Sequence, residues 1–131
     1  MKTLATILAG AALALTGTTA ALAKSAEENE AKLARMLEGR TAGEPVNCIS
    51  ALSSSRLEVI EHVGIVYDAG STIYVARPTD PRQLARDDIL VFNRFGSQLC
   101  TNDVIRTVDR YQGHTTGAVF LEEFVPYTKA G

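Results

Sequence analysis

The feature that most constrains the fold is a series of short, largely apolar runs with the two-residue period of β-strands. The six runs lie at residues 57–61, 63–67, 72–77, 88–94, 104–109 and 116–121. Turn signals separate several of them, at 68–71, 96–97 and 112–114. Because no helical pattern of any length interrupts these runs, they predict a mainly β, antiparallel fold, either a small barrel or a two-layer sandwich.

In the first two runs every second residue is apolar, and these residues are predicted to face the core together: Leu57, Val59, Val63, Ile65 and Tyr67. The turn at 68–71 and the returning run at 72–77 predict the first hairpin. Segment 78–87 contains two prolines and is predicted to be a loop with one helical turn at 82–86. All eight aromatic residues follow position 66, which places most of the core in the C-terminal two-thirds.

Residues 1–23 have the pattern of a secretory signal peptide. Lys2 supplies a positive start, residues 4–16 carry no charge, and Ala21-Leu22-Ala23 is a small-x-small cleavage pattern. The alternative is a membrane anchor, but the uncharged run is shorter than the roughly 20 residues that cross a bilayer. The pattern, bacterial in style, therefore predicts export to the periplasm or secretion, with no transmembrane segment after processing.

The segment 24–43 is predicted to form an N-terminal helix and a linker, ahead of a disulfide-stapled β domain at 44–131. Ser25 and Glu28 have the spacing of a capping box, and Gly39 follows residue 38, which predicts a helix over 25–38. Its apolar stripe is thin and consists of Ala26, Leu33, Met36 and Leu37. We therefore expect loose docking, a turn-rich linker at 39–47, and a β domain that stays folded when residues 24–40 are deleted.

Cys48 and Cys100 are the two cysteines, and export would take them to an oxidising compartment. The default expectation is a structural disulfide between them. A redox pair would show Cys-x-x-Cys, and a zinc site would show closely spaced ligand pairs; neither pattern is present. Asp103, three residues after Cys100, is expected to cap the turn that positions the disulfide.

The charge distribution excludes some partners. The formal net charge is −2, with no basic excess in either half of the part after the signal, so nucleic acid and anionic membrane surfaces are not predicted partners. Six arginines between 77 and 110 could form an anion-binding or partner-binding surface: Arg77, Arg82, Arg86, Arg94, Arg106 and Arg110. Five aspartates share that window, and local ion pairing is the favoured interpretation.

No residue pattern predicts catalysis, a cofactor or a metal. His62 and His114 stand alone, at a strand corner and in a turn, and are interpreted as surface histidines. The serines at 53–55 lack the framing of a nucleophile elbow and are interpreted as a polar loop. The adjacent carboxylates at 87–88 and 122–123 would point to opposite faces of a strand, so they are interpreted as solvated charges.

Four short motifs resemble a known family. They are Pro45-x-x-Cys48-Ile49, Thr72-Ile73-Tyr74-Val75-x-x-Pro78, Phe95-Gly96-Ser97-Gln98-Leu99-Cys100-x-x-Asp103 and Leu121-x-x-Phe124-Val125-Pro126-Tyr127. Together they resemble a family of small secreted proteins of Gram-negative bacteria that is known only as a domain of unknown function. The resemblance covers about residues 44–128. It implies export and the fold class, and it implies no activity, substrate or site residue.

The favoured hypothesis is a non-enzymatic periplasmic binding or scaffolding protein for an unknown envelope protein or ligand. The alternative is a proteinaceous inhibitor of a secreted or periplasmic enzyme such as a lysozyme, by analogy of form. A hydrolytic enzyme comes third and would need a cleft that joins a histidine to a carboxylate. An inhibitor should present a projecting loop, plausibly at 78–87, whereas a binding module should present a groove or an exposed apolar patch.

Overall fold

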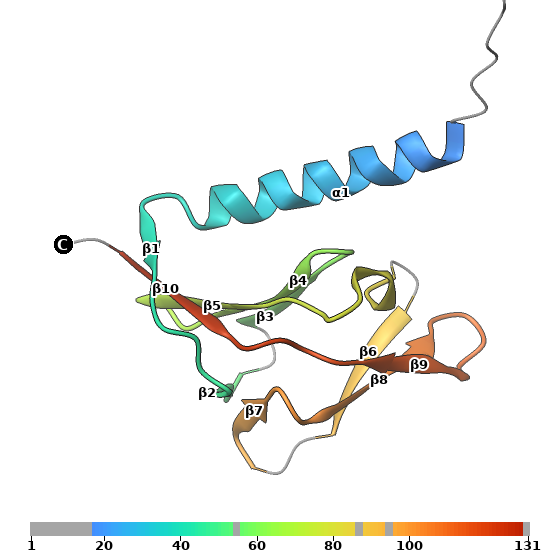
Figure 1. Cartoon of the computed structure of the whole chain (residues 1–131). Coiled ribbons are helices and arrows are strands. Elements are labelled where there is room, and N and C mark those ends of the chain that lie inside the picture. Colours follow the sequence, from blue (N-terminus) through green and yellow to red (C-terminus); the bar gives the residue numbers. More distant parts are fainter. Residues whose placement is uncertain (1–16, 54–55, 86–87, 94–95, 130–131) are drawn as a thin grey trace, which may run out of the picture.

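The computed structural model describes residues 17–53, 56–85, 88–93 and 96–129, and it begins with one helix that precedes all the strands (Figure 1). The elements in chain order are α1 (Gly17–Met36), β1 (Arg40–Ala42), β2 (Cys48–Ser50), β3 (Leu57–Ile60), β4 (Gly64–Asp68), β5 (Thr72–Ala76), the 3₁₀ turn η2 (Pro81–Gln83), β6 (Asp88–Asn93), β7 (Gln98–Cys100), β8 (Val104–Asp109), β9 (Thr115–Val119) and β10 (Val125–Lys129). The six expected runs correspond to β3, β4, β5, β6, β8 and β9.

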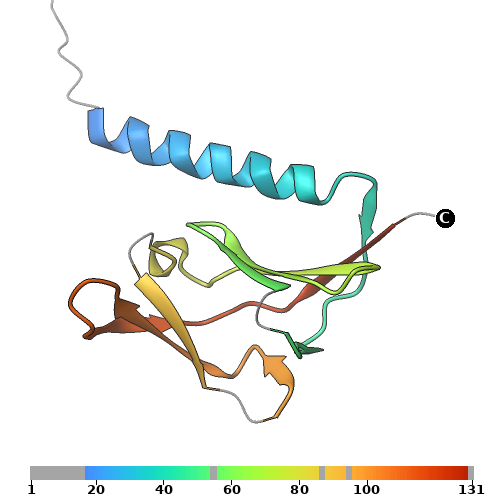
Figure 2. The same ribbon diagram turned by 180° about the vertical axis from the view of Figure 1, so that it is seen from behind.

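The strands form three antiparallel sheets. The largest has the order β1-β10-β5-β4-β3, a second has the order β6-β8-β9, and β2 pairs with β7 in a short ribbon. In Figures 1 and 2, α1 covers one face of the five-stranded sheet, while the smaller sheet and the ribbon lie against the other face. The expectation of a mainly β, antiparallel fold with one N-terminal helix is confirmed. Of the two expected forms, a small barrel and a two-layer sandwich, the sandwich fits the structure.

Strand alternation gives the five-stranded sheet two buried faces. On β4, Ile65 and Tyr67 point toward the smaller sheet, whereas Val66 points toward α1. The inner core, between the sheets, consists of Ile49, Ala51, Ile65, Tyr67, Ala76, Leu84, Leu99, Ile105, Val119, Leu121 and Phe124. The helix core, between α1 and the large sheet, consists of Leu33, Ile60, Val63, Val66, Ile73 and Val75.

One residue of the expected parity faces the other way. Val63 packs in the helix core. Tyr67 lies in the inner core, and Leu57 packs against it. The cause is the turn before it, because His62 has a left-handed backbone with φ of 60°. A left-handed residue breaks the extended geometry on which alternation depends, so the parity restarts at β4.

Helix α1 begins earlier than expected and contacts the large sheet. It begins at Gly17, so Ser25 lies inside the helix and does not cap it. Leu33 is only 3% exposed and belongs to the helix core. Polar residues add to the contacts of the thin apolar stripe, and the strength of docking stays a prediction. The Asn29 Nδ2 donates to the carbonyl oxygen of Glu61 at 3.0 Å.

Two ion pairs join α1 to the large sheet. Arg77 on the sheet side binds both carboxylate oxygens of Glu30, at 2.6 and 3.2 Å. Lys32 pairs with Glu58 of β3. The hydrogen bond to Glu30 raises the pKa of Arg77 above its ordinary value, while partial burial opposes that rise.

The segment expected to be a linker contains part of the large sheet. Residues 40–42 form β1, in which Arg40 lies opposite Lys129 and Ala42 opposite Tyr127 of β10. Further on, the backbones of Val46 and Phe124 form an isolated bridge. Gly39 has a φ of 73°, a conformation that glycine adopts without strain, and it turns the chain from α1 into β1. The linker prediction for 40–42 is therefore wrong.

The hairpin turns use aspartates as expected for turn residues. In the β4–β5 turn, Asp68 Oδ1 accepts from the backbone N–H of Gly70 at 2.8 Å. In the β8–β9 turn, Asp109 Oδ1 accepts from the N–H groups of Gln112 and Tyr111, at 2.7 and 2.8 Å. These two bonds stabilise the ionised form and hold the pKa of Asp109 below its ordinary value.

Candidate functional site

Cys48 and Cys100 form a disulfide, as expected. They face each other directly in the β2–β7 register, and their Cα atoms are 4.0 Å apart. Asp103 Oδ2 accepts from the backbone N–H of Cys100 at 2.8 Å, which confirms its capping role. The backbone N–H of Ala51, just after β2, donates to Ser97 just before β7 at 2.8 Å. The disulfide therefore joins two segments that run side by side.

The two histidines lie in turns, where the sequence places them. His62 occupies the β3–β4 turn, with Nε2 3.3 Å from Glu61 Oε1 and Nδ1 3.1 Å from the carbonyl oxygen of Pro81. Because a carbonyl can only accept, Nδ1 carries the proton of that contact. His114 is exposed in the β8–β9 turn. His62 thus has a carboxylate neighbour. The histidine lines neither of the pockets described below.

The arginines are paired only in part. Arg82 binds Asp80 within the expected window, and this bond lowers the pKa of Asp80 and raises that of Arg82. Arg77 pairs outside the window, with Glu30 of α1. Arg106 and Arg110 have no ion pair with any described residue, and Arg86 and Arg94 lie outside the described residues. Local pairing with aspartates accounts for Arg82 alone.

The serines and paired carboxylates form no shared centre in the described chain. Ser53 lines a pocket, and Glu122 and Glu123 are both exposed after β9. Ser54, Ser55 and Asp87 lie outside the described residues. Within residues 17–53, 56–85, 88–93 and 96–129, no group of three His, Cys, Asp or Glu residues could hold a metal ion.

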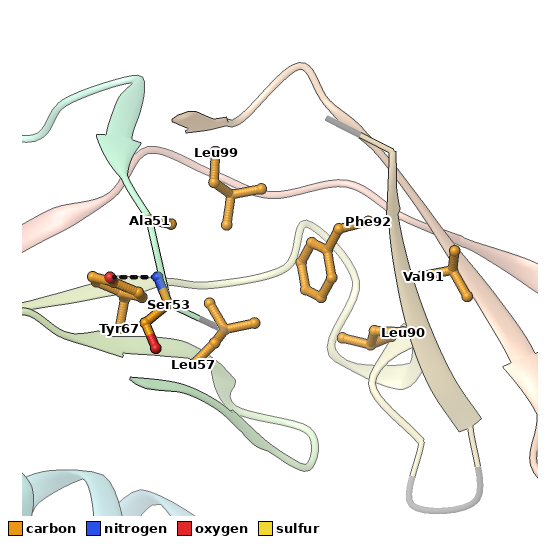
Figure 3. A pocket seen from close by; sticks show the side chains of 8 residues that line it. All are labelled: Ala51, Ser53, Leu57, Tyr67, Leu90, Val91, Phe92 and Leu99. Carbon is orange, nitrogen blue, oxygen red and sulfur yellow. Dashed lines mark hydrogen bonds between the residues drawn. The ribbon is translucent and has the colours of Figure 1, made fainter. Parts of the chain in front are cut away.

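A largely apolar pocket of about 350 Å³ lies between the two main sheets. We call it the Tyr67 pocket, and Figure 3 shows its lining: Ala51, Ser53, Leu57, Tyr67, Leu90, Val91, Phe92 and Leu99. Leu90 and Phe92 of β6 point toward Leu57 of β3. The polar groups include the Tyr67 hydroxyl, which lies 3.5 Å from the backbone nitrogen of Ser53. Its walls therefore suit an apolar group.

A second hollow of about 370 Å³ continues along β6. We call it the Val59 pocket, and its lining is Val59, Leu84, Ala85, Asp88, Ile89, Leu90, Phe92 and Arg110. Leu90 and Phe92 line both pockets. Val59 and Ile89 are 41% and 43% exposed, so apolar surface reaches the opening. The two pockets together form what we call the edge groove.

The edge groove lies where two sheet edges approach each other. β3 is the last strand of the five-stranded sheet and β6 the first strand of the smaller one, and neither has a second strand partner in the described chain. Leu57 and Val59 come from β3, while Leu90 and Phe92 come from β6. Unpaired strand edges with apolar side chains are sites where another chain can bind.

Sequence reasoning missed this groove, although one signal for it was present. Residues 89–92 are Ile-Leu-Val-Phe, apolar at both parities. Such a strand is usually buried on both faces, as in the middle of a sheet. Here the same pattern lies on an edge strand, so part of its apolar surface is left for a partner. Whether β6 is central or at an edge depends on the tertiary pairing, which the local pattern does not contain.

The comparisons with known proteins assign no relative. No family model, no curated protein and no solved structure matches the chain. Among the described residues, no helix combines the length and the apolar character that crossing a membrane requires. The chemistry of the edge groove is therefore the main guide to function.

Proposed function

We propose that this protein is an exported, non-enzymatic binding protein whose edge groove takes up apolar side chains of an envelope polypeptide. The observation that carries the proposal is the pair of largely apolar pockets along the edges of β3 and β6, which share Leu90 and Phe92. Each pocket is near the lower end of the size range of ligand sites, about 300–1,000 Å³, which suits single side chains better than a large ligand. A groove is also what the binding-module hypothesis requires.

The inhibitor alternative has less support, because segment 78–85 lies against the body of the protein. The backbones of Pro78 and Leu121 form a bridge, and the N–H of Thr79 donates to Phe120 at 2.8 Å. The carbonyl of Leu84 accepts from the N–H of His62 at 3.1 Å, and the Leu84 side chain is buried. The described part of the expected projecting loop is therefore held down over its length.

The non-enzymatic part of the proposal is supported by the state of the candidate catalytic groups. Both cysteines are in the disulfide. The Nδ1 of His62 is engaged with the carbonyl of Pro81, and Glu61 faces its other ring nitrogen. A nucleophile with a base beside it is the usual requirement for covalent hydrolysis. In the edge groove the serine, Ser53, lines the Tyr67 pocket, whereas the carboxylate, Asp88, lines the Val59 pocket.

Export and processing are part of the proposal and can be tested directly. We expect the protein recovered from the periplasm to begin at Lys24, because Ala21-Leu22-Ala23 is a cleavage pattern. Cleavage there would remove the first turns of α1 and place Ser25 and Glu28 at the new helix start, in capping-box spacing. Intact-mass measurement decides the matter, and a chain that still begins at Met1 in the inner membrane would contradict it. Membership of the resembled family stays a prediction.

Binding to the edge groove is tested with a matched pair of surface valines. Val59→Glu places a charge in the groove, and Val104→Glu makes the same change at a valine that lines neither pocket. The two valines are 41% and 52% exposed, so we expect small effects of either change on stability. The protein recovered from the periplasm is titrated with the neutral apolar dye N-phenylnaphthylamine, whose fluorescence rises on binding.

We expect Val59→Glu to weaken dye binding by roughly tenfold or more, because binding would desolvate the new carboxylate. Val104→Glu should bind the dye like the parent protein. Equal affinity in all three proteins would place the dye elsewhere and refute the edge groove as the binding site. A parent protein that does not bind the dye at all would refute the proposed function.

A further inference from the structure

The hydrogen bonds of Asp88, the first residue of β6, show which N–H and C=O groups of this strand face β8. The N–H of Asp88 is directed to the carbonyl of Ala85, at 3.4 Å, and not to β8. Its partner in the register is Asp109, whose N–H donates to His114 and whose carbonyl accepts from Gly113, both at 2.9 Å. The pair Asp88–Asp109 therefore exchanges no hydrogen bonds between β6 and β8.

Antiparallel pairs alternate between those that exchange two hydrogen bonds and those that exchange none. The β6–β8 register runs without a shift from Asp88 to Asn93, so the alternation continues along the strand. Ile89 and Val91 consequently bond to β8. Leu90 and Phe92 direct their N–H and C=O groups away from β8, toward the outer edge of β6.

That outer edge opens into the edge groove. Val91 lines the Tyr67 pocket although its side chain points away from those of Leu90 and Phe92 in Figure 3. The pocket therefore reaches the backbone edge of β6 as well as its inner face. No hydrogen bond joins the N–H or C=O of Leu90 or Phe92 to another strand or loop of the described chain. Outward-facing backbone groups on an edge strand are a template with which another strand can pair.

We infer that the bound polypeptide adds to β6 as an extra β-strand and inserts two apolar side chains, two residues apart, into the Tyr67 and Val59 pockets. This inference rests on the proposed function and specifies the conformation of the ligand. Side chains two residues apart on a strand point to the same face and are separated by about 7 Å. Those on the inner face would lie beside Leu90 and Phe92, the two residues that line both pockets.

A second copy of this chain fits the edge groove less well. If β6 paired with β6 of a copy, the inward side chains would be Leu90 and Phe92 of that copy, which already pack against its own inner core. Both pockets would then stay empty. An extended segment with the pattern apolar-x-apolar can form the backbone bonds and fill the pockets together, which is the usual way in which strand addition combines affinity with specificity.

Amide hydrogen exchange tests the backbone half of the inference. In the protein recovered from the periplasm, the amides of Leu90 and Phe92 should exchange at least roughly tenfold faster than those of Ile89 and Val91, because only the latter pair is bonded to β8. Saturation with the peptide acetyl-Lys-Thr-Val-Thr-Phe-Thr-Lys-amide should slow Leu90 and Phe92 at least roughly tenfold and leave Ile89 and Val91 nearly unchanged. Unchanged exchange at saturation would overturn strand addition.

Two N-methylated peptides separate strand addition from apolar binding alone. One carries N-methyl groups on Val and Phe, and the other on the two threonines that follow them. In a strand only one of these sets faces β6, so one analogue should bind at least roughly tenfold more weakly than the other. Loss with methylated Val and Phe indicates an antiparallel added strand, and loss with methylated threonine a parallel one.

Equal affinity of the two analogues overturns strand addition. If Val59→Glu still abolishes their binding in that case, the apolar site stands and the proposed function survives without this inference. Protection of Leu90 and Phe92 in the absence of peptide, together with a dimer in sedimentation, would also overturn it, in favour of pairing between two copies. Binding of the dye but not of any peptide would overturn it as well.

Discussion

Replacing Leu33 with alanine is expected to lower the free energy of unfolding by about 2–5 kcal/mol. Leu33 is 3% exposed and lies in the helix core with Ile60, Val66 and Val75 of the large sheet. Truncation would remove apolar contacts and leave a cavity between two rigid elements, which collapse only in part. Denaturant unfolding of the purified protein measures the effect.

The matched control is Leu52→Ala, because Leu52 is 76% exposed and the same atoms are removed. We expect a change within about 0.5 kcal/mol there. The sequence alone predicts that the β domain stays folded when residues 24–40 are deleted. Because this deletion removes Leu33 from the helix core and Arg40 from β1, the structure leads to the opposite expectation, a loss of cooperative unfolding. A Leu33→Ala effect no larger than that of Leu52→Ala would show that α1 docks weakly, as its apolar stripe alone suggests.

The docking of α1 illustrates what a single helical segment does not contain. The apolar stripe of this helix is thin, and from it alone a loose helix is the reasonable expectation. The contacts that add to it come from polar residues whose partners lie far along the chain: Asn29 with Glu61, Glu30 with Arg77 and Lys32 with Glu58. Each exposed ion pair contributes little, so Leu33 and its neighbours in the helix core remain the main source of the stability of α1 docking.

The strands could be predicted where they are long enough to show a recognisable apolar pattern in the sequence. Both β4 and β5 have five mostly apolar residues, with an Asp-Ala-Gly-Ser turn between them. β1, β2 and β7 have three residues each, which is too short for a period to appear. Their existence depends on partners such as β10, more than 80 residues later for β1, so only the tertiary structure reveals them.

The residues of the edge groove were predictable as apolar strand residues but not as a site. Leu57, Tyr67 and Leu90 have the patterns of core positions, and each does contact the inner core. They become the wall of a pocket because no strand of the described residues pairs with β3 or β6 where the two sheets end. Which edges of the sheets stay uncovered is a property of the strand order, and the strand order is set by long-range pairing.

Removal of the disulfide should destabilise the protein by about 4 kcal/mol according to the chain-entropy model, because the two cysteines are 52 residues apart. The double variant Cys48→Ala and Cys100→Ala avoids an unpaired thiol. The β2–β7 ribbon contains three residue pairs, so it has few other bonds to hold it once the covalent link is gone. We expect a large fall in the denaturant midpoint and in resistance to proteases.

The same variant tests the link between the disulfide and the edge groove. Ala51 follows β2 and Leu99 belongs to β7, and both line the Tyr67 pocket. A ribbon that opens would therefore remove one wall of the pocket, and dye binding should fall under conditions in which the variant is still folded. Ser50→Ala, an exposed position of β2, is the matched control and should leave stability and dye binding within error. Two titratable thiols in the folded parent protein would refute the pairing. Parent-like dye affinity in the folded double variant would show that the edge groove does not depend on the disulfide.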